Sequence, residues 1–227
     1  MATISEDAVP VAEVRGTVAW LHRYLLVLRF ALFNVVAFGL VAAVHLQGWL
    51  AGALVGYTGW LSAGIFGVFL FGLALCGVRV WRVSRELNDL RAGTPRRGSR
   101  AARYLDAAAG RHPQGRTLNA NVLRMRIANY IGVVRHTANS LVFLGLVGTV
   151  IGFIIALSAV DPENSVSVDN VAAMVATLIQ GMSIALYTTL LGAVLHLWLL
   201  VNYRMLATGA MHLFNAIVDF EEHRVGN

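Results

Sequence analysis

The chain has 227 residues, of which 57% are hydrophobic and 13% are charged. This composition is too apolar for a soluble domain of this length. The formal net charge is +6, and every basic residue is an arginine. Most arginines lie between Arg79 and Arg135 and flank apolar runs, where contact with anionic lipid headgroups explains them. We therefore expect an integral membrane protein that contacts membrane lipids and binds no nucleic acid.

The first part of the chain contains a predicted hairpin of two membrane spans. Residues 1–24 mix acidic and basic side chains with a helical repeat of apolar residues, which predicts an amphipathic segment at the membrane surface. Residues 25–81 form the first transmembrane hairpin, with spans at Leu25–Leu46 and Ala53–Trp81. A turn at Gln47-Gly48-Trp49 joins the two spans.

The remaining chain is predicted to form a basic segment, a second hairpin and a tail. Residues 82–137 are polar and basic, and clusters of Gly and Pro at 93–98 and 110–115 predict breaks. On either side of these clusters, the stretches RVSRELNDLR and LNANVLRMRIANYIGVVRH have apolar residues at intervals of three and four, which predicts helices that continue the membrane helices inward. Residues 138–203 form the second transmembrane hairpin around the acidic loop AVDPENSVSVDN, and residues 204–227 form a short amphipathic tail.

The arginines predict the orientation of these spans. The Gln47 turn carries no charge and the acidic loop has no arginine, so both are expected outside. The amino terminus, the Arg-rich segment and the tail are then cytoplasmic, which is consistent with four spans. The expected fold is an all-α integral membrane protein with four transmembrane helices, both termini in the cytoplasm and cytoplasmic helical extensions.

The second hairpin carries small and hydroxyl-bearing residues on one face of each span. In the first of these spans, the residues at helical spacing are Gly145, Thr149, Gly152 and Ala156. In the next span they are Thr177, Gly181, Ala185, Thr188 or Thr189, Gly192 and His196. Small residues let membrane helices pack closely, and such faces occur in many unrelated bundles. The threonines add hydroxyl groups suited to an ion pathway.

Depth in the membrane favours a shared role for two of these threonines. At 1.5 Å per residue, Thr149 lies about 16 Å beyond Ala138, and Thr189 lies about 20 Å inside a boundary near Asn202. The alternative is that each hydroxyl only bonds a carbonyl one turn back. All 12 acidic residues lie outside the central parts of the apolar runs. If the protein conducts a cation, the carboxylate that binds it must therefore come mainly from another chain.

Two segments carry a resemblance to a known family. LVFLGLVGTVIGF resembles the LLGLLGTVxG segment of the MotA/TolQ/ExbB proton-channel family, and the matching residues are Gly148, Thr149 and Gly152. QGMSIALYTTLLGAV is similar to the family's PGIAEALxATxxGL segment, and the matching residues are Gly181, Ala185, Thr189 and Gly192. The resemblance covers mainly the last two spans.

Two positions depart from the family pattern. Gln180 replaces a proline, and Ile184 replaces the glutamate of ExbB-like members, so the role of that glutamate does not transfer to this chain. The four-span topology with both termini inside is closer to MotA than to the three-span TolQ and ExbB pattern.

The resemblance implies a subunit of a rotary motor in the bacterial inner membrane, which converts ion-motive force into mechanical work. It implies a homopentamer around two copies of a single-span MotB/TolR/ExbD-like partner, each supplying a membrane Asp. Thr149 and Thr189 correspond to polar pore residues, and the further ion-pathway candidates are Thr188 and Thr177. Helix-packing or pore-lining roles are expected for Gly145, Gly148, Gly152, Gly181, Ala185 and Gly192. The transported ion is H⁺ or Na⁺, and no cofactor or metal is expected.

Other functions remain open alternatives on the sequence. A non-conducting membrane scaffold needs only the glycine-rich packing faces. A secondary transporter would show inverted repeats, and none is found. The sequence has no nucleophile, metal cluster or phosphate loop at a suitable spacing, so an enzyme is not expected. Which process the motor drives depends on the partner.

Overall fold

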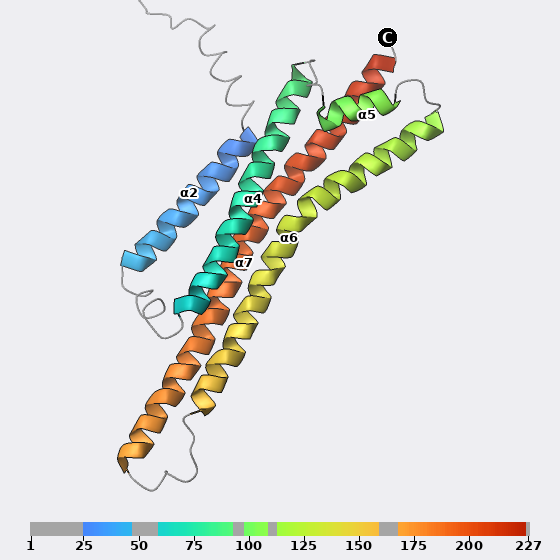
Figure 1. The fold of residues 1–227 in the computed structure, drawn as a ribbon. Coiled ribbons are helices and arrows are strands. Elements are labelled where there is room, and N and C mark those ends of the chain that lie inside the picture. The colour runs from blue at the N-terminus through green and yellow to red at the C-terminus, as the bar shows by residue number, and fades with distance from the viewer. Residues whose placement is uncertain (1–24, 47–58, 93–97, 109–112, 159–167, 226–227) are drawn as a thin grey trace, which may run out of the picture.

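Four long helices and one short helix make up the part of the computed structural model that is described here, residues 25–46, 59–92, 98–108, 113–158 and 168–225 (Figure 1). Their bounds, in chain order, are α2 (Leu25–Leu46), α4 (Gly59–Arg91), α5 (Arg100–Ala108), α6 (Pro113–Leu157) and α7 (Val168–Val225). These residues contain no β-strand. The long helices lie alongside one another, and α5 lies across one end, which we call the α5 end (Figure 1).

Each long helix contains a segment long and apolar enough to cross a membrane. These segments are Leu25–Ala43, Gly59–Leu90, Thr117–Leu157 and Val171–Glu222. At 1.5 Å per residue, α6 is about 68 Å long and α7 about 87 Å, so both extend well beyond a hydrocarbon core of about 30 Å. The prediction of an all-helical protein with four spans is confirmed, and the spans in α4, α6 and α7 continue without a break into polar helical extensions.

The predicted element bounds agree with the structure in part. The helix α2 has the bounds expected for the first span. The helix α6 begins at Pro113, inside the second predicted break, because proline suits the first helical position, where its missing N–H needs no partner. The amphipathic segment 1–24, the turn at Gln47 and the acidic loop around Asp161 lie outside the described residues. The division of the chain into five segments stays a prediction.

The core lies between α4, α6 and α7. Its buried apolar residues recur at three and four positions along each helix, which is the spacing of helices that pack nearly parallel or antiparallel. On α6 these residues are Leu123, Ile127, Ile131, Val134, Ala138 and Leu141. On α7 they are Leu195, Leu199, Leu206, Ala210, Leu213 and Ile217. The bundle is therefore held together chiefly over its middle and at the α5 end.

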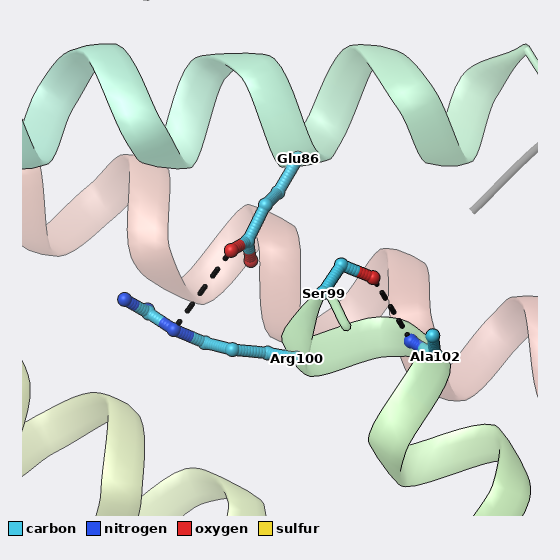
Figure 2. Close-up of polar contacts among 4 residues, drawn as sticks. All are labelled: Glu86, Ser99, Arg100 and Ala102. Carbon is cyan, nitrogen blue, oxygen red and sulfur yellow. Dashed lines mark hydrogen bonds and ion pairs between the residues drawn. The ribbon is translucent and has the colours of Figure 1, made fainter. Parts of the chain in front are cut away.

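The helix α5 is short and amphipathic. Ser99 caps its start, because Ser99 Oγ accepts a hydrogen bond from the backbone N–H of Ala102 at 3.0 Å (Figure 2). Ala101, Tyr104 and Leu105 are buried against the bundle. This helix thus closes the space between the extensions of α4, α6 and α7.

At the opposite end, α6 and α7 extend beyond the described parts of α2 and α4 (Figure 1). In that region the two helices pack on each other, while many of their large apolar side chains are exposed. Examples are Phe143, Leu146, Phe153, Leu186 and Leu190. In a membrane these surfaces face lipid or another protein chain.

Candidate functional site

Small residues bring α6 and α7 into close contact at the level of the two motifs. A Cβ atom built on Gly152 would lie 2.6 Å from the backbone N of Ala185 and 2.7 Å from the carbonyl O of Gly181. A Cβ atom on Gly181 would lie 2.5 Å from the backbone N of Ala156. The obstacles are backbone atoms, which cannot rotate away. These positions therefore require glycine as long as the helices keep this separation.

The same contact continues toward the middle of the helices. A Cβ atom on Gly192 would lie 2.7 Å from the carbonyl O of Leu141, and one on Gly145 would lie 3.1 Å from the carbonyl O of Thr188. The pairs 145 with 192, 152 with 185 and 156 with 181 show that the helices run antiparallel in one fixed register. The predicted packing residues of both spans thus lie in a single interface within the chain.

Thr188 lies inside this interface. Its side chain occupies the space into which a Cβ atom on Gly148 would project, and Thr188 is only 1% exposed. Its hydroxyl donates to carbonyls of its own helix, at 3.0 Å to Ile184 O and 3.1 Å to Ala185 O. Thr188 therefore fills the space left by the missing side chain of Gly148. Its hydroxyl is hydrogen-bonded within its own helix.

Thr149 and Thr189 lie on one side of the helix pair. Gly148 on α6 and Thr188 on α7 face each other, and Thr149 and Thr189 are the next residues along their helices. From one residue to the next, the side-chain direction turns by about 100° around the helix axis. Because two antiparallel right-handed helices turn in opposite senses when viewed from one end, these equal turns carry both side chains to the same side. Consistently, Thr189 Oγ1 donates to the carbonyl of Gly145, one turn before Thr149, at 3.4 Å.

These two threonines also lie at nearly one level. In the observed register, the position opposite Thr189 falls between residues 147 and 148 of α6. Thr149 is one or two residues further along, which corresponds to about 2 Å of axial rise. Thr189 is exposed and Thr149 is half-buried, with its hydroxyl 2.6 Å from Leu146 O. Two hydroxyl-bearing residues thus mark one level on the outer side of the α6–α7 pair.

Thr177 lies nearer the loop that joins α6 to α7. It is half-buried, and its hydroxyl donates to Ala173 O at 3.1 Å, one turn back in its own helix. It is twelve residues from Thr189, or about 18 Å along the axis. The structure therefore does not bring Thr177 to the level of the other threonines. Ile184, at the position of the family's glutamate, is 8% exposed and packs inside the chain.

A polar contact that the sequence did not predict joins α2 to α7. Asn34 Nδ2 donates to Asn202 Oδ1 at 2.7 Å, and Trp198 Nε1 donates to Asn34 Oδ1 at 3.0 Å. The two asparagines also bond carbonyls of their own helices, those of Phe30 and Trp198. The only sequence signal was an amide in the middle of an apolar run. The partners are 168 positions apart, so spacing alone cannot pair them.

A second polar cluster lies under α5. Arg100 Nε lies 4.0 Å from Glu86 Oε1, as Figure 2 shows. The guanidinium groups of Arg100 and Arg79 lie 3.9 Å and 4.5 Å from the centre of the Tyr130 ring, and Arg79 also donates to the Tyr130 carbonyl. Tyr104 donates to Glu221 at 2.7 Å. These contacts tie α5 to the three core helices.

No group of three or more His, Cys, Asp or Glu side chains that could hold a metal ion occurs among the described residues. Residues 25–46, 59–78, 138–157 and 171–203, which are the most apolar parts of the four long helices, also contain no acidic residue. The site consists of hydroxyls, backbone carbonyls and small residues in a membrane environment. Such groups can line an ion pathway, but they supply no fixed negative charge.

The fold and this site define a multi-pass membrane protein whose last two helices form a closely packed hairpin with hydroxyls on one side. The model of the MotA/TolQ/ExbB proton channel family matches residues 108–219, which include all of α6 and most of α7. The chain belongs to this family, as the two motifs predicted. No curated protein and no solved structure matches it.

Proposed function

We propose that this chain is the ion-channel subunit of a two-component rotary motor in the bacterial inner membrane, with both termini in the cytoplasm. In this proposal it converts a proton-motive force into mechanical work. The observation that carries the proposal is the placement of Thr149 and Thr189 on one side of the α6–α7 pair at one level. Family membership supplies the class of activity.

The proposed partner is a single-span protein of the MotB/TolR/ExbD kind that brings an acidic residue into the membrane. The need for it follows from charge: ion sites within the hydrocarbon core normally use a carboxylate or a histidine, and residues 25–46, 59–78, 138–157 and 171–203 contain no carboxylate. The hydroxyls of Thr149 and Thr189 would then face the partner's carboxylate as accessory ligands. Membership of the family implies such a complex.

The proposed assembly is a homopentamer around two partner helices. It is supported by the end of the α6–α7 hairpin that extends beyond the described parts of α2 and α4. There, large apolar side chains such as Phe153 and Leu186 are exposed. Neighbouring copies would cover one side of this hairpin and turn the threonine side toward the centre. The exposed apolar residues farther out would then contact lipid.

The first experiment isolates the complex through a tag on this chain in native membranes and identifies its components. The proposal expects one co-purified single-span protein with an Asp or Glu in its apolar segment, and a chain ratio near five to two. A complex without such a protein contradicts the two-component proposal.

The second experiment measures ion flux through that complex in liposomes. A proton-sensitive dye reports flux under an imposed potential, with and without Na⁺ at constant pH. The Thr149→Val, Thr189→Val double variant should lose most of the flux. Thr208→Val is the matched control, because Thr208 is an exposed residue of α7 whose hydroxyl bonds Arg204 O in its own helix. A double variant that conducts like wild type contradicts the pore assignment, and a wild-type complex without flux favours a non-conducting scaffold.

A further inference from the structure

His196 is an ionisable side chain within the apolar part of α7. Its Nδ1 lies 2.8 Å from the carbonyl O of Ala138 on α6, and the residue is half-buried. A carbonyl oxygen only accepts hydrogen bonds, so Nδ1 must carry the hydrogen. In the neutral ring, this contact leaves Nε2 as the nitrogen with the free lone pair.

The remaining nitrogen of this ring is available to accept a proton. Nε2 of His196 has no hydrogen-bond partner among the described residues, and it is not one of the buried polar atoms that lack a partner. It therefore reaches the surface of the chain. The contact with Ala138 fixes the ring and leaves the Nε2 lone pair unoccupied.

The His196 ring lies on the same side of α7 as Thr189, nearer the α5 end than the level of Thr149 and Thr189. His196 follows Thr189 by seven residues, which is almost two full turns, so both lie on the same face of α7 about 10 Å apart. Its partner Ala138 precedes Thr149 by eleven residues on α6, in the direction of the α5 end. His196 thus lies between the threonines and the first charged residues beyond them, on the side of the pair that carries both hydroxyls.

We infer that His196 is a proton-accepting residue on the cytoplasmic half of the ion pathway. The inference rests on the proposed function, because it assigns a role within the same conduction path. A water-borne proton arriving from the threonine level binds the Nε2 lone pair, which gives an imidazolium with both nitrogens protonated. The imidazolium then returns one proton from Nε2 to a water on the cytoplasmic side. The ring ends neutral, and one proton has moved inward.

The charged and titratable groups around His196 do not neutralise it. On α6 the nearest are Arg135 and His136, within one turn of Ala138. On α4 the first charge is Arg79, and on α2 the charged residue is Arg29. On α7 itself, Arg204 follows by eight residues and Tyr203 by seven. Among the described side chains of α7 the first carboxylate is Asp219, 23 residues beyond His196, so no described carboxylate of α7 lies beside the imidazolium, which is a transient state.

The test replaces His196 by Asn, whose amide can still donate to Ala138 but cannot carry a proton. The purified complex with its partner is placed in liposomes, and proton flux is measured from pH 5.5 to 8.5. We expect flux to fall by about 100-fold or more, which is the lower end of what a positioned proton-transferring side chain contributes. The chain ratio and elution volume of the complex should not change. His212→Asn, at an exposed position further along α7, should conduct like wild type.

The outcomes separate this inference from the proposed function. A wild-type complex that conducts protons together with a His196→Asn complex that conducts equally well overturns the role of His196 and leaves the channel proposal standing. An equal loss in His212→Asn also overturns it. A wild-type complex that conducts no protons, or only Na⁺, overturns both the proton pathway and the role of His196.

A measurement on the wild-type complex covers the case in which the variant does not assemble. The ring ¹⁵N signals of His196, assigned through Leu195 and Leu197, are followed over the same pH range. The inference requires a signal from the doubly protonated ring while the complex conducts protons. A ring that stays neutral throughout overturns the inference.

Discussion

The side chain of Thr188 occupies the space above Gly148, so closely that a Cβ atom on Gly148 would overlap the Thr188 hydroxyl and its Cβ. This contact fixes the rotation of both helices. It places Thr188 between them and turns the next residue, Thr189, to the outer side. One residue pair thereby decides which of two adjacent threonines is open to a partner.

The first prediction concerns the close approach of the two helices. Gly152→Ala should destabilise the protein by about 1–3 kcal/mol, because the new Cβ meets backbone atoms of Ala185 and Gly181 that cannot move without separating the helices. Gly132→Ala is the matched control on α6, since nothing lies within 4 Å of its Cβ position. It should be neutral or slightly stabilising. Thermal unfolding in detergent measures both, and equal melting temperatures would contradict the packing described.

The second prediction separates the two adjacent threonines. Thr188→Val keeps the shape that fills the space above Gly148 and removes a hydroxyl bonded only within α7, so ion flux should stay near wild type. Thr189→Val removes the hydroxyl of an exposed residue at the Thr149 level, so flux should fall severalfold. Proton flux of each single variant in liposomes is the measurement. The reverse pattern would place Thr188, not Thr189, in the pathway.

The third prediction concerns the asparagine pair that joins α2 to α7. Asn34→Leu and Asn202→Leu should each destabilise the protein, because each removes the hydrogen bonds between the two buried amides. Hydrogen bonds between membrane helices contribute about 0.6 kcal/mol on average and about 1.7 kcal/mol at most, so a coupling energy in this range is expected. A double-mutant cycle of unfolding free energies provides it. Strictly additive effects would show that the pair does not interact.

The fourth prediction concerns the attachment of α5. Tyr104→Phe removes a buried hydroxyl that donates to Glu221 at 2.7 Å and should cost about 1–3 kcal/mol. The weakened helix should also be cut faster by trypsin after Arg103. Tyr187→Phe, which alters an exposed tyrosine of α7, is the control and should change neither quantity. Unchanged cleavage of the Tyr104 variant would show that this hydrogen bond does not hold α5 in place.

Much of the architecture could be predicted from local patterns. The bounds of α2 and the continuation of α4 and α6 beyond the membrane follow from apolar composition and from periodicity at three and four residues, which neighbouring residues set. The tail from residue 204 was expected as a short amphipathic segment, and the structure shows it as an unbroken part of α7. The start of α6 at Pro113 was missed, because Gly and Pro signal a break as readily as a helix start.

By itself, the sequence determined four apolar helices, two small-residue faces and the family to which they belong, because each depends on neighbouring residues within one or two turns. Only the tertiary structure decided how those faces meet. Thr188 and Thr189 are adjacent, have the same chemistry and both lie near the small-residue face, so the sequence does not show which of them points toward α6. The packing of Thr188 against Gly148 in the structure places Thr188 between the helices and Thr189 on the exposed side. Asn34 with Asn202, and His196 with Ala138, likewise depend on the packing of helices far apart in the chain.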